Sequence, residues 1–161
     1  LRLLTEKFRL SISREQLSAL ALELGSDCPF YLLNKPCFAT GRGEMLEAIP
    51  LDLSPYHLVI VNPGIHVNTR WAFSSIVPIN PVRSIKDILL QPIETWKHQL
   101  VNDFEVPVTK EFPVIADIRQ HLYAHGALYA AMSGSGSTVY GIFGKKPEDV
   151  VFPASYWVKY I

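Results

Sequence analysis

Residues 24–30 read L-G-S-D-C-P-F and place one acidic side chain in a tight corner between two apolar segments. Gly25 follows the last residue of a helical pattern, where glycine supplies a left-handed C-cap at no steric cost. The chain is therefore predicted to turn sharply at Gly25 and to present Asp27 beside Pro29. Two roles are open for Asp27. Its carboxylate either caps the segment that follows by accepting a backbone N–H, or takes part in chemistry.

The segment before this corner is predicted to be an amphipathic helix. Ser13 with Gln16 three residues later is the signature of a capping box and marks its start. The apolar residues that recur at the spacing of one helical face are Leu17, Leu20, Ala21 and Leu24. The helix therefore runs from just after Ser13 to the corner.

A second notable stretch, residues 132–143, reads M-S-G-S-G-S-T-V-Y-G-I-F and is a small-residue loop between two strand-like runs. Glycine-rich loops let backbone N–H groups approach a phosphate or another backbone closely. Taken alone, S-G-S-G-S fits any β-turn and lacks the lysine of a P-loop. The loop therefore indicates a function only in combination with other motifs of the chain.

These motifs, in their order along the chain, resemble those of the GHMP small-molecule kinases. They are L-G-S-D-C-P-F (24–30), A-T-G-R-G-E (39–44), N-P-G-I-H-V-N-T (62–69), N-D-F-E (102–105) and the glycine loop. The resemblance spans nearly the whole chain. It is strongest to the members that act on a cytidine diphosphate-linked sugar alcohol.

Two features of this family are absent from the sequence: the nucleotide-binding loop P-x-x-x-G-L-G-G-G-S-S and a substrate-facing lysine near the N-terminus. Residues 1–8 resemble the helix that follows that loop, and the first residue is not Met. The resemblance therefore implies the C-terminal part of a kinase that uses ATP and Mg²⁺. The nucleotide site is expected mostly outside this chain, and the fragment is expected to be inactive alone.

The resemblance also implies roles for individual residues. Asp27 is the expected general base. The residues expected to form the loop over the phosphate side are Gly134, Ser135, Gly136 and Ser137. The residues expected to line the cytidine and diphosphate side are Gly41, Arg42, Thr69 and Phe73. For Arg42 the alternative is a solvent-exposed turn residue, and for Phe73 it is a core aromatic.

The N-D-F-E motif has a structural and a functional reading. Its acidic and amide groups could bind a metal or a phosphate, but Asp103 and Glu105 would point apart on a helix. Capping and anchoring of the next helix is therefore favoured. Since no second ligand stands at a suitable spacing from His66 either, no metal-ligating set of residues is predicted.

Composition excludes several classes of protein. The 161 residues are 48% hydrophobic and carry 15 basic and 15 acidic residues, so the formal net charge is zero. Without a long charge run, a nucleic-acid surface or a polybasic membrane patch has no support. The two cysteines, Cys28 and Cys37, lack zinc-type spacing, so reduced thiols in a cytoplasmic protein are expected. No apolar run approaches the roughly 18 residues of a membrane span.

The order of predicted elements indicates an α+β fold. Strands are predicted at residues 37–40, 57–61, 128–132, 138–143 and 156–161, and the clearest later helix at residues 113–125. Residues 145–153 are predicted to form at most a reduced helix, because the segment is short. The later elements resemble a ferredoxin-like unit. Residues 1–54 are expected to be a remnant of the N-terminal kinase domain and residues 55–161 the C-terminal domain, with a linker at Pro78–Pro81.

Two other functions remain open. A GHMP kinase of the homoserine or mevalonate type would share Asp27 and the glycine loop, but gives no reason for the run from Asn62 to Phe73. A non-catalytic ferredoxin-like binding or dimerisation module would explain the fold without chemistry.

Overall fold

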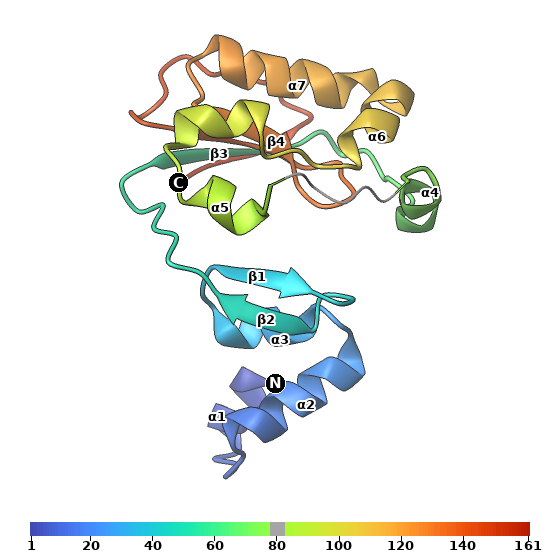
Figure 1. Cartoon of the computed structure of the whole chain (residues 1–161), viewed down its shortest axis with the longest axis vertical. Helices are drawn as coiled ribbons and strands as arrows, with labels where there is room; N and C mark the ends of the chain where they lie inside the picture. The colour runs from blue at the N-terminus through green and yellow to red at the C-terminus, as the bar shows by residue number, and fades with distance from the viewer. Residues whose placement is uncertain (78–82) are drawn as a thin grey trace. The chain divides into compact units, whose positions relative to one another are not determined.

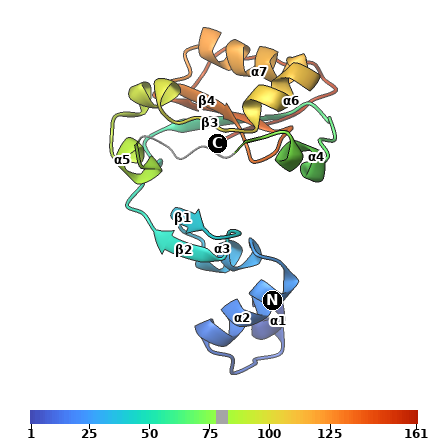
Figure 2. The same cartoon turned by 45° about the vertical axis from the view of Figure 1, so that its right-hand side comes forward.

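The computed structural model describes residues 1–77 and 83–161, so the predicted linker Pro78–Pro81 lies outside the described residues. The chain forms two compact units, residues 1–51 and residues 52–161, shown in Figures 1 and 2. The division falls inside the proline-bounded segment Pro50–Pro55, where a boundary is expected from sequence. Which kinase domain each unit represents stays a prediction.

The first unit contains three helices and one hairpin. The helices are α1 (Arg2–Lys7), α2 (Arg14–Leu24) and α3 (Cys28–Leu33), and the strands are β1 (Cys37–Thr40) and β2 (Met45–Ala48). The strands pair antiparallel, from Cys37 opposite Ala48 to Thr40 opposite Met45. Strand β2 is absent from the sequence-based expectation, because its M-L-E-A stretch lacks the β-branched and aromatic residues typical of strands.

The two ends of α2 illustrate one confirmed and one wrong prediction. At the start, the Ser13 hydroxyl accepts the Gln16 N–H at 3.2 Å and the Gln16 side chain accepts the Ser13 N–H at 2.9 Å, which confirms the capping box. At the end, Gly25 has φ 163° and ψ 152°, so the left-handed cap is wrong. The Cys28 N–H donates to the Gly25 carbonyl at 3.1 Å, so the chain reverses over residues 25–28 and Gly25 itself stays extended.

The second unit is a four-stranded sheet with helices. Its strands are β3 (His57–Asn62), β4 (Tyr129–Met132), β5 (Val139–Phe143) and β6 (Trp157–Tyr160). Its helices are α4 (Thr69–Ser74), α5 (Ile85–Leu89), the 3₁₀ helix η1 (Ile93–His98), α6 (Glu105–Glu111) and α7 (Pro113–Ala124). The predicted strands and the long helix are confirmed to within one or two residues at their ends.

The sheet has the order β4-β5-β3-β6, and all neighbours are antiparallel. Strands β3 and β4 therefore run in the same direction with β5 between them, as do β5 and β6 with β3 between them. This is the ferredoxin-like arrangement, and the fold is α+β as predicted. The second crossover, residues 144–156, contains no helix at all.

The core of this unit lies between the sheet and α7, which runs along one face while α5 lies on the other side (Figures 1 and 2). Helix α7 buries Ile115, Ile118 and Leu122 on one face, as its spacing predicts. From the sheet, β3 contributes Val59 and Val61. This packing places the C-terminal ends of β3 and β4 at the same end of the sheet, where the three motifs of this unit lie: residues 62–69, 102–105 and the glycine loop.

Candidate active site

The glycine loop joins β4 to β5 and forms a tight turn. The Ser133 N–H donates to the Thr138 carbonyl at 2.8 Å, and the Gly136 N–H donates to the Ser133 carbonyl at 3.0 Å. Gly134 and Ser135 are thus the central residues of a hydrogen-bonded turn. Within the described residues, no group accepts a hydrogen bond from their N–H groups. Paired free N–H groups of this kind can bind the oxygens of an anion such as phosphate.

The N-P-G-I-H-V-N-T segment holds this loop from one side. The Ser137 hydroxyl donates to the Ile65 carbonyl at 2.6 Å, and the Asn62 amide donates to the Thr138 hydroxyl at 2.9 Å. Ser137 is only 3% exposed, so its hydroxyl is committed to this contact. The hydroxyls of Thr69 and Ser135 lie 3.5 Å apart. The structure therefore brings together two motifs that are more than sixty residues apart in sequence.

Phe73 lies near this junction, one helical turn beyond Thr69 on α4. Asn68 caps the start of this helix, because its side chain accepts the Trp71 N–H at 3.0 Å. Phe73 is 61% exposed, so it is not a core residue. Its ring meets that of Phe104 edge to face with centroids 4.9 Å apart. An exposed aromatic surface suited to stacking therefore stands beside the loop.

The Asp27 corner belongs to the first unit. The Asp27 side chain makes no hydrogen bond to the N-terminus of α3, so the predicted capping role is wrong. The Ser26 hydroxyl lies 3.4 Å from the carboxylate, which packs against the backbone of Gly43 so closely that a Cβ there would overlap it. Gly43 has φ +111°, a conformation that favours glycine. The structure thus brings Asp27 to the G-R-G turn, although sequence reasoning assigned no role to Gly43.

Glu44 closes the G-R-G turn. Its carboxylate accepts the Arg42 N–H at 2.6 Å. Hydrogen bonds from the backbone N–H groups of Glu44 and Arg42 lower the pKa of Glu44, so the carboxylate stays ionised. Gly41 lies over this carboxylate with φ +70°. The Arg42 side chain is exposed, and it remains available for either predicted role.

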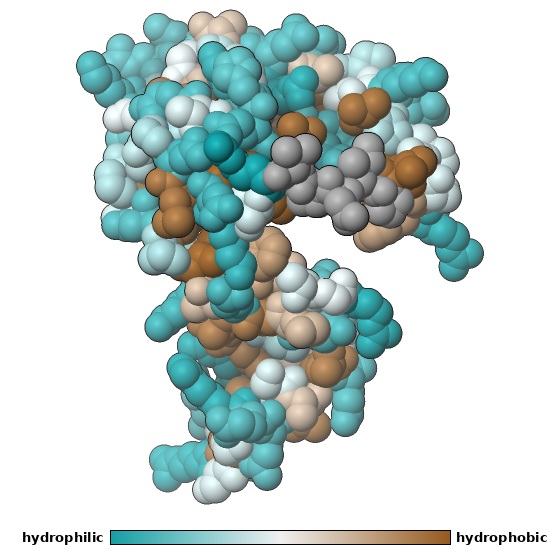
Figure 3. All heavy atoms as spheres, in the orientation of Figure 1, coloured by the Kyte–Doolittle hydropathy of each residue, from teal (hydrophilic) through white to brown (hydrophobic). Residues whose placement is uncertain are grey.

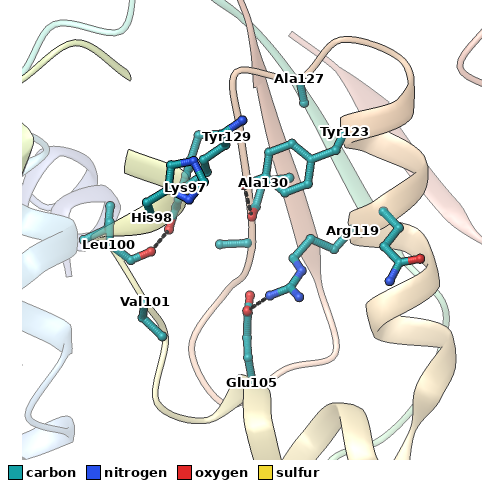
Figure 4. A pocket seen from close by; sticks show the side chains of 12 residues that line it. Lys97, His98, Leu100, Val101, Glu105, Arg119, Tyr123, Ala127, Tyr129 and Ala130 are labelled. Atoms are coloured by element: carbon teal, nitrogen blue, oxygen red, sulfur yellow. Dashed lines mark hydrogen bonds and ion pairs between the residues drawn. The ribbon is translucent and has the colours of Figure 1, made fainter. Parts of the chain in front are cut away.

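A cavity of about 480 Å³ lies in the second unit between η1, α7 and the free edge of β4 (Figure 4). It contains none of the predicted site residues. The Tyr129 hydroxyl donates to the Leu100 carbonyl at 3.0 Å, and the Tyr123 hydroxyl donates to the Ala130 carbonyl at 3.1 Å. Burial raises the pKa of both tyrosines, so both hydroxyls remain protonated donors at neutral pH. Glu105 and Arg119 form an ion pair in the same wall.

Three further observations concern ligands, thiols and membranes. The described residues contain no group of three or more His, Cys, Asp or Glu side chains placed to hold a metal ion. Both cysteines are free and half-buried. In the described part of the chain, no helix has the length and apolar character needed to cross a bilayer.

Comparison with known proteins connects these features to one family. Residues 84–153 match the family model described as GHMP kinases C terminal. The chain is 47% identical over 151 residues to 4-diphosphocytidyl-2-C-methyl-D-erythritol kinase of Bacteroides fragilis, covering 94% of this chain and 54% of the relative. The enzyme of the same name from Azobacteroides pseudotrichonymphae is 49% identical over 148 residues, covering 91% and 55%. The chain therefore spans about half the length of these relatives.

Solved structures of GHMP-type kinases also resemble this chain. A crystal structure of 4-(cytidine 5'-diphospho)-2C-methyl-D-erythritol kinase matches 86% of this chain and 51% of its own, with a TM-score of 0.72 and 30% identity. A homoserine kinase from Cytophaga hutchinsonii matches 98% of this chain and 60% of its own, with a TM-score of 0.68 but 12% identity, a likeness of fold alone. The family model places residues 84–153 in the GHMP kinase family, and the sequence and structural matches show that most of the chain is similar to members of that family.

Proposed function

We propose that the protein to which this chain belongs is a cytoplasmic kinase that phosphorylates the 2-hydroxyl of 4-diphosphocytidyl-2-C-methyl-D-erythritol with ATP, in non-mevalonate isoprenoid precursor synthesis. The proposal extends to this chain the name carried by relatives that are 41–49% identical over about nine-tenths of its length. Substrate, donor and reaction belong to the whole protein, of which this chain supplies two groups of residues.

The observation that carries the proposal is the turn centred on Gly134 and Ser135 at the end of β4. Phosphoryl transfer asks the protein mainly for positioning and for stabilisation of charge on the phosphoryl oxygens. The two free N–H groups of this turn are donors suited to those oxygens, and they cost no reorganisation because the loop is already held. Thr69 and Phe73 flank the turn, so a diphosphate and a base can be held beside it.

Asp27 is proposed to act on the hydroxyl that receives the phosphoryl group. Its carboxylate is exposed, and contact with Gly43 restricts where it can lie. It can accept a hydrogen bond from the hydroxyl, orient it for attack and take its proton. ATP supplies the phosphoryl group. Mg²⁺ would arrive with the nucleotide.

A substrate panel on the full-length protein tests this proposal. With Mg-ATP and each alcohol in turn, we expect phosphorylation of 4-diphosphocytidyl-2-C-methyl-D-erythritol, detected as product mass and ADP release, and at least 100-fold lower kcat/KM for homoserine and mevalonate. Preference for either of those alcohols would overturn the substrate assignment. If the full-length protein phosphorylated none of the three alcohols, the chain would instead be a non-catalytic ferredoxin-like module. The 161-residue chain alone is expected to give no calorimetric signal at millimolar Mg-ATP.

A further inference from the structure

Asn102, the first residue of the N-D-F-E motif, contacts the glycine loop at backbone groups that the Asn62–Thr69 segment does not bind. Its side-chain carbonyl accepts the Phe104 N–H at 3.0 Å, which helps begin α6. Its side-chain amide donates to the carbonyls of Met132 and Gly134, both at 2.8 Å. Both amide hydrogens are therefore used on the two backbone carbonyls that flank Ser133.

Glu105, the last residue of the motif, holds the neighbouring backbone group. One carboxylate oxygen accepts the Met132 N–H at 2.6 Å, and the other is paired with Arg119 on α7 (Figure 4). Glu105 is only 7% exposed, and a buried carboxylate is tolerated only when paired and hydrogen-bonded. Strand β4 is an edge strand, so the N–H and C=O of Met132 would otherwise be unpaired. The motif satisfies both of them.

The geometry points to a role for N-D-F-E in aiming the phosphate-binding donors: Asn102 and Glu105 are positioning residues for the loop, and Arg119 orients Glu105. The physical reason is the planarity of the peptide bond. The carbonyl of Gly134 and the N–H of Ser135 belong to one rigid unit and point in opposite directions. Because Asn102 holds the Gly134 carbonyl toward its own side chain, the free Ser135 N–H points away from Asn102, toward the proposed phosphate.

The same argument applies to the peptide unit that joins Met132 to Ser133. Asn102 holds the Met132 carbonyl on one side, while the Ser133 N–H on the other side donates to Thr138 and closes the loop. Glu105 fixes the Met132 N–H and so prevents this end of β4 from rotating. Neither residue needs to touch the substrate. The second residue of the motif, Asp103, is exposed and takes no part in these contacts.

Amide hydrogen exchange in the 161-residue chain tests the contact itself. Asn102→Asp keeps the acceptor for Phe104 but removes both donors and sets a carboxylate against two carbonyls. We expect exchange at Ser133 and Gly136 to speed up at least 10-fold, with exchange at Val59 and Val61 unchanged. Asp103→Asn is the matched control and should change neither. If the loop amides of both variants stayed as protected from exchange as in the wild type, the proposal would be overturned. It would also be overturned if both variants lost the same amount of protection.

Arg119→Gln provides a second variant if Asn102→Asp fails to fold. It leaves Asn102 intact and reaches the loop only through Glu105, so exchange at Met132 should rise more than at Ser133. Uniform acceleration at all amides, including those of β3, would show general destabilisation and would count against the proposal.

The kinetic part rests on the proposed function and uses the full-length enzyme. For Asn102→Asp we expect kcat per folded enzyme to fall at least 10-fold, with KM for the cytidine substrate within about twofold, because the lost donor faces the transferring phosphate. Unchanged kcat with a changed KM would refute the aiming role. If the wild-type protein transferred no phosphoryl group, the proposed function would fail, and hydrogen exchange alone would then decide whether the motif positions the loop.

Discussion

Asp27 and Gly43 show how a single glycine can determine where a carboxylate lies. Gly43 is separated from Asp27 by the whole of α3 and β1, yet its backbone forms the surface against which the carboxylate rests. Any larger residue would occupy the space of the carboxylate, and φ +111° would strain it as well. The G-R-G turn therefore restricts the position of the Asp27 carboxylate, which is separate from the contact with substrate that the resemblance predicts.

Replacement of Asp27 by Asn tests its chemical role. Asn retains the size of Asp but cannot take a proton, so turnover of the full-length enzyme should fall about 10²- to 10⁴-fold. Because Asp27 makes no capping bond, thermal stability should stay within about 1 °C of wild type. Glu23→Gln, an exposed change on α2, serves as the control and should leave turnover unchanged. Near wild-type turnover of Asp27→Asn would remove Asp27 from the mechanism.

Replacement of Phe73 by Ala tests whether the ring stacks on the substrate base. Stacking on an aromatic ring contributes about 1–3 kcal/mol, so the apparent substrate constant should rise about 5- to 150-fold. Stability should change little because the ring is mostly exposed. Phe73→Tyr keeps the ring and should bind normally. A melting temperature lowered by several degrees with unchanged affinity would instead make Phe73 a structural partner of Phe104.

At the scale of elements, the glycine loop is a connection between two strands that every neighbouring segment helps to hold. Asn62 is the last residue of β3, Ile65 follows that strand, Asn102 precedes α6, and all three bond to residues 132–138. A loop with this many fixed backbone groups has little freedom left to lose when an anion binds. Its free donors are therefore preorganised.

Packing under the loop predicts a large effect of Gly136→Ala. A Cβ at Gly136 would lie 2.9 Å from the Met132 sulfur and 3.3 Å from a Val67 methyl, and because both side chains are buried, a shift of either one disturbs the core. Gly126→Ala is the control, because Gly126 also has a positive φ but nothing within 4 Å of a new Cβ. In urea denaturation of this chain, Gly136→Ala should lose about 1–3 kcal/mol more than Gly126→Ala. Equal losses would show that backbone strain alone acts at Gly136.

At the scale of the whole molecule, the two units differ in how much they bury. In residues 1–51, all of which the structure describes, only Ala21 and Pro29 are buried, while Leu3 is 80% and Leu24 70% exposed. The second unit has a continuous core that includes Val61, Ile115 and Leu122. Figure 3 shows apolar residues at the surface of one face of the molecule. Stability is therefore expected to be concentrated in residues 52–161.

Hydrogen exchange of the 161-residue chain checks this difference. The amides of α2 should exchange at least 100-fold faster than those of β3 and α7, because a helix with little buried surface opens locally without global unfolding. The comparison needs only intrinsic-rate correction and no variant. Equal protection in the two units would show that they unfold together.

Buried tyrosines predict an alkaline limit to the stability of the second unit. Burial raises the pKa of Tyr129, Tyr123 and Tyr140 above the value of about 10 that an unfolded chain has. Above pH 10 the unfolded chain loses these protons first, so stability falls as pH rises, by up to about 1.4 kcal/mol per pH unit for each tyrosine. Below that pH the effect vanishes.

Tyr129→Phe should make the loss of stability above pH 10 less steep, by up to about 1.4 kcal/mol per pH unit, because one buried tyrosine no longer titrates. At neutral pH it should cost about 1 kcal/mol, because the bond to the Leu100 carbonyl is lost. Urea denaturation from pH 8 to 11 measures both quantities. Tyr31→Phe, at an exposed position of the first unit, should change neither slope nor midpoint. An unchanged alkaline slope in Tyr129→Phe would mean that Tyr129 ionises as readily in the folded state as in the unfolded one.

Local patterns in the sequence determined the helices, most strands and the identity of the motifs. The capping box at Ser13, the face of α7 and the cap at Asn68 each depend on residues three or four apart, and such contacts form whenever the local chain is helical. The continuous apolar run at residues 57–61 likewise indicated β3. Resemblance then pointed to Asp27, Thr69, Phe73 and the glycine loop as site residues, roles that await the experiments described above.

Only the tertiary structure decided which motifs meet and what each one does there. Asn102 reaches carbonyls 30 and 32 residues away, and Asp27 rests on Gly43 across a helix and a strand. Such contacts depend on the strand order and on the packing of α7, which no local pattern contains. The conformation of Gly25 was mispredicted because the chain reverses in the turn over residues 25–28, so Gly25 itself stays extended. A motif's sequence thus limits the bonds its side chains can make, while the fold supplies their partners.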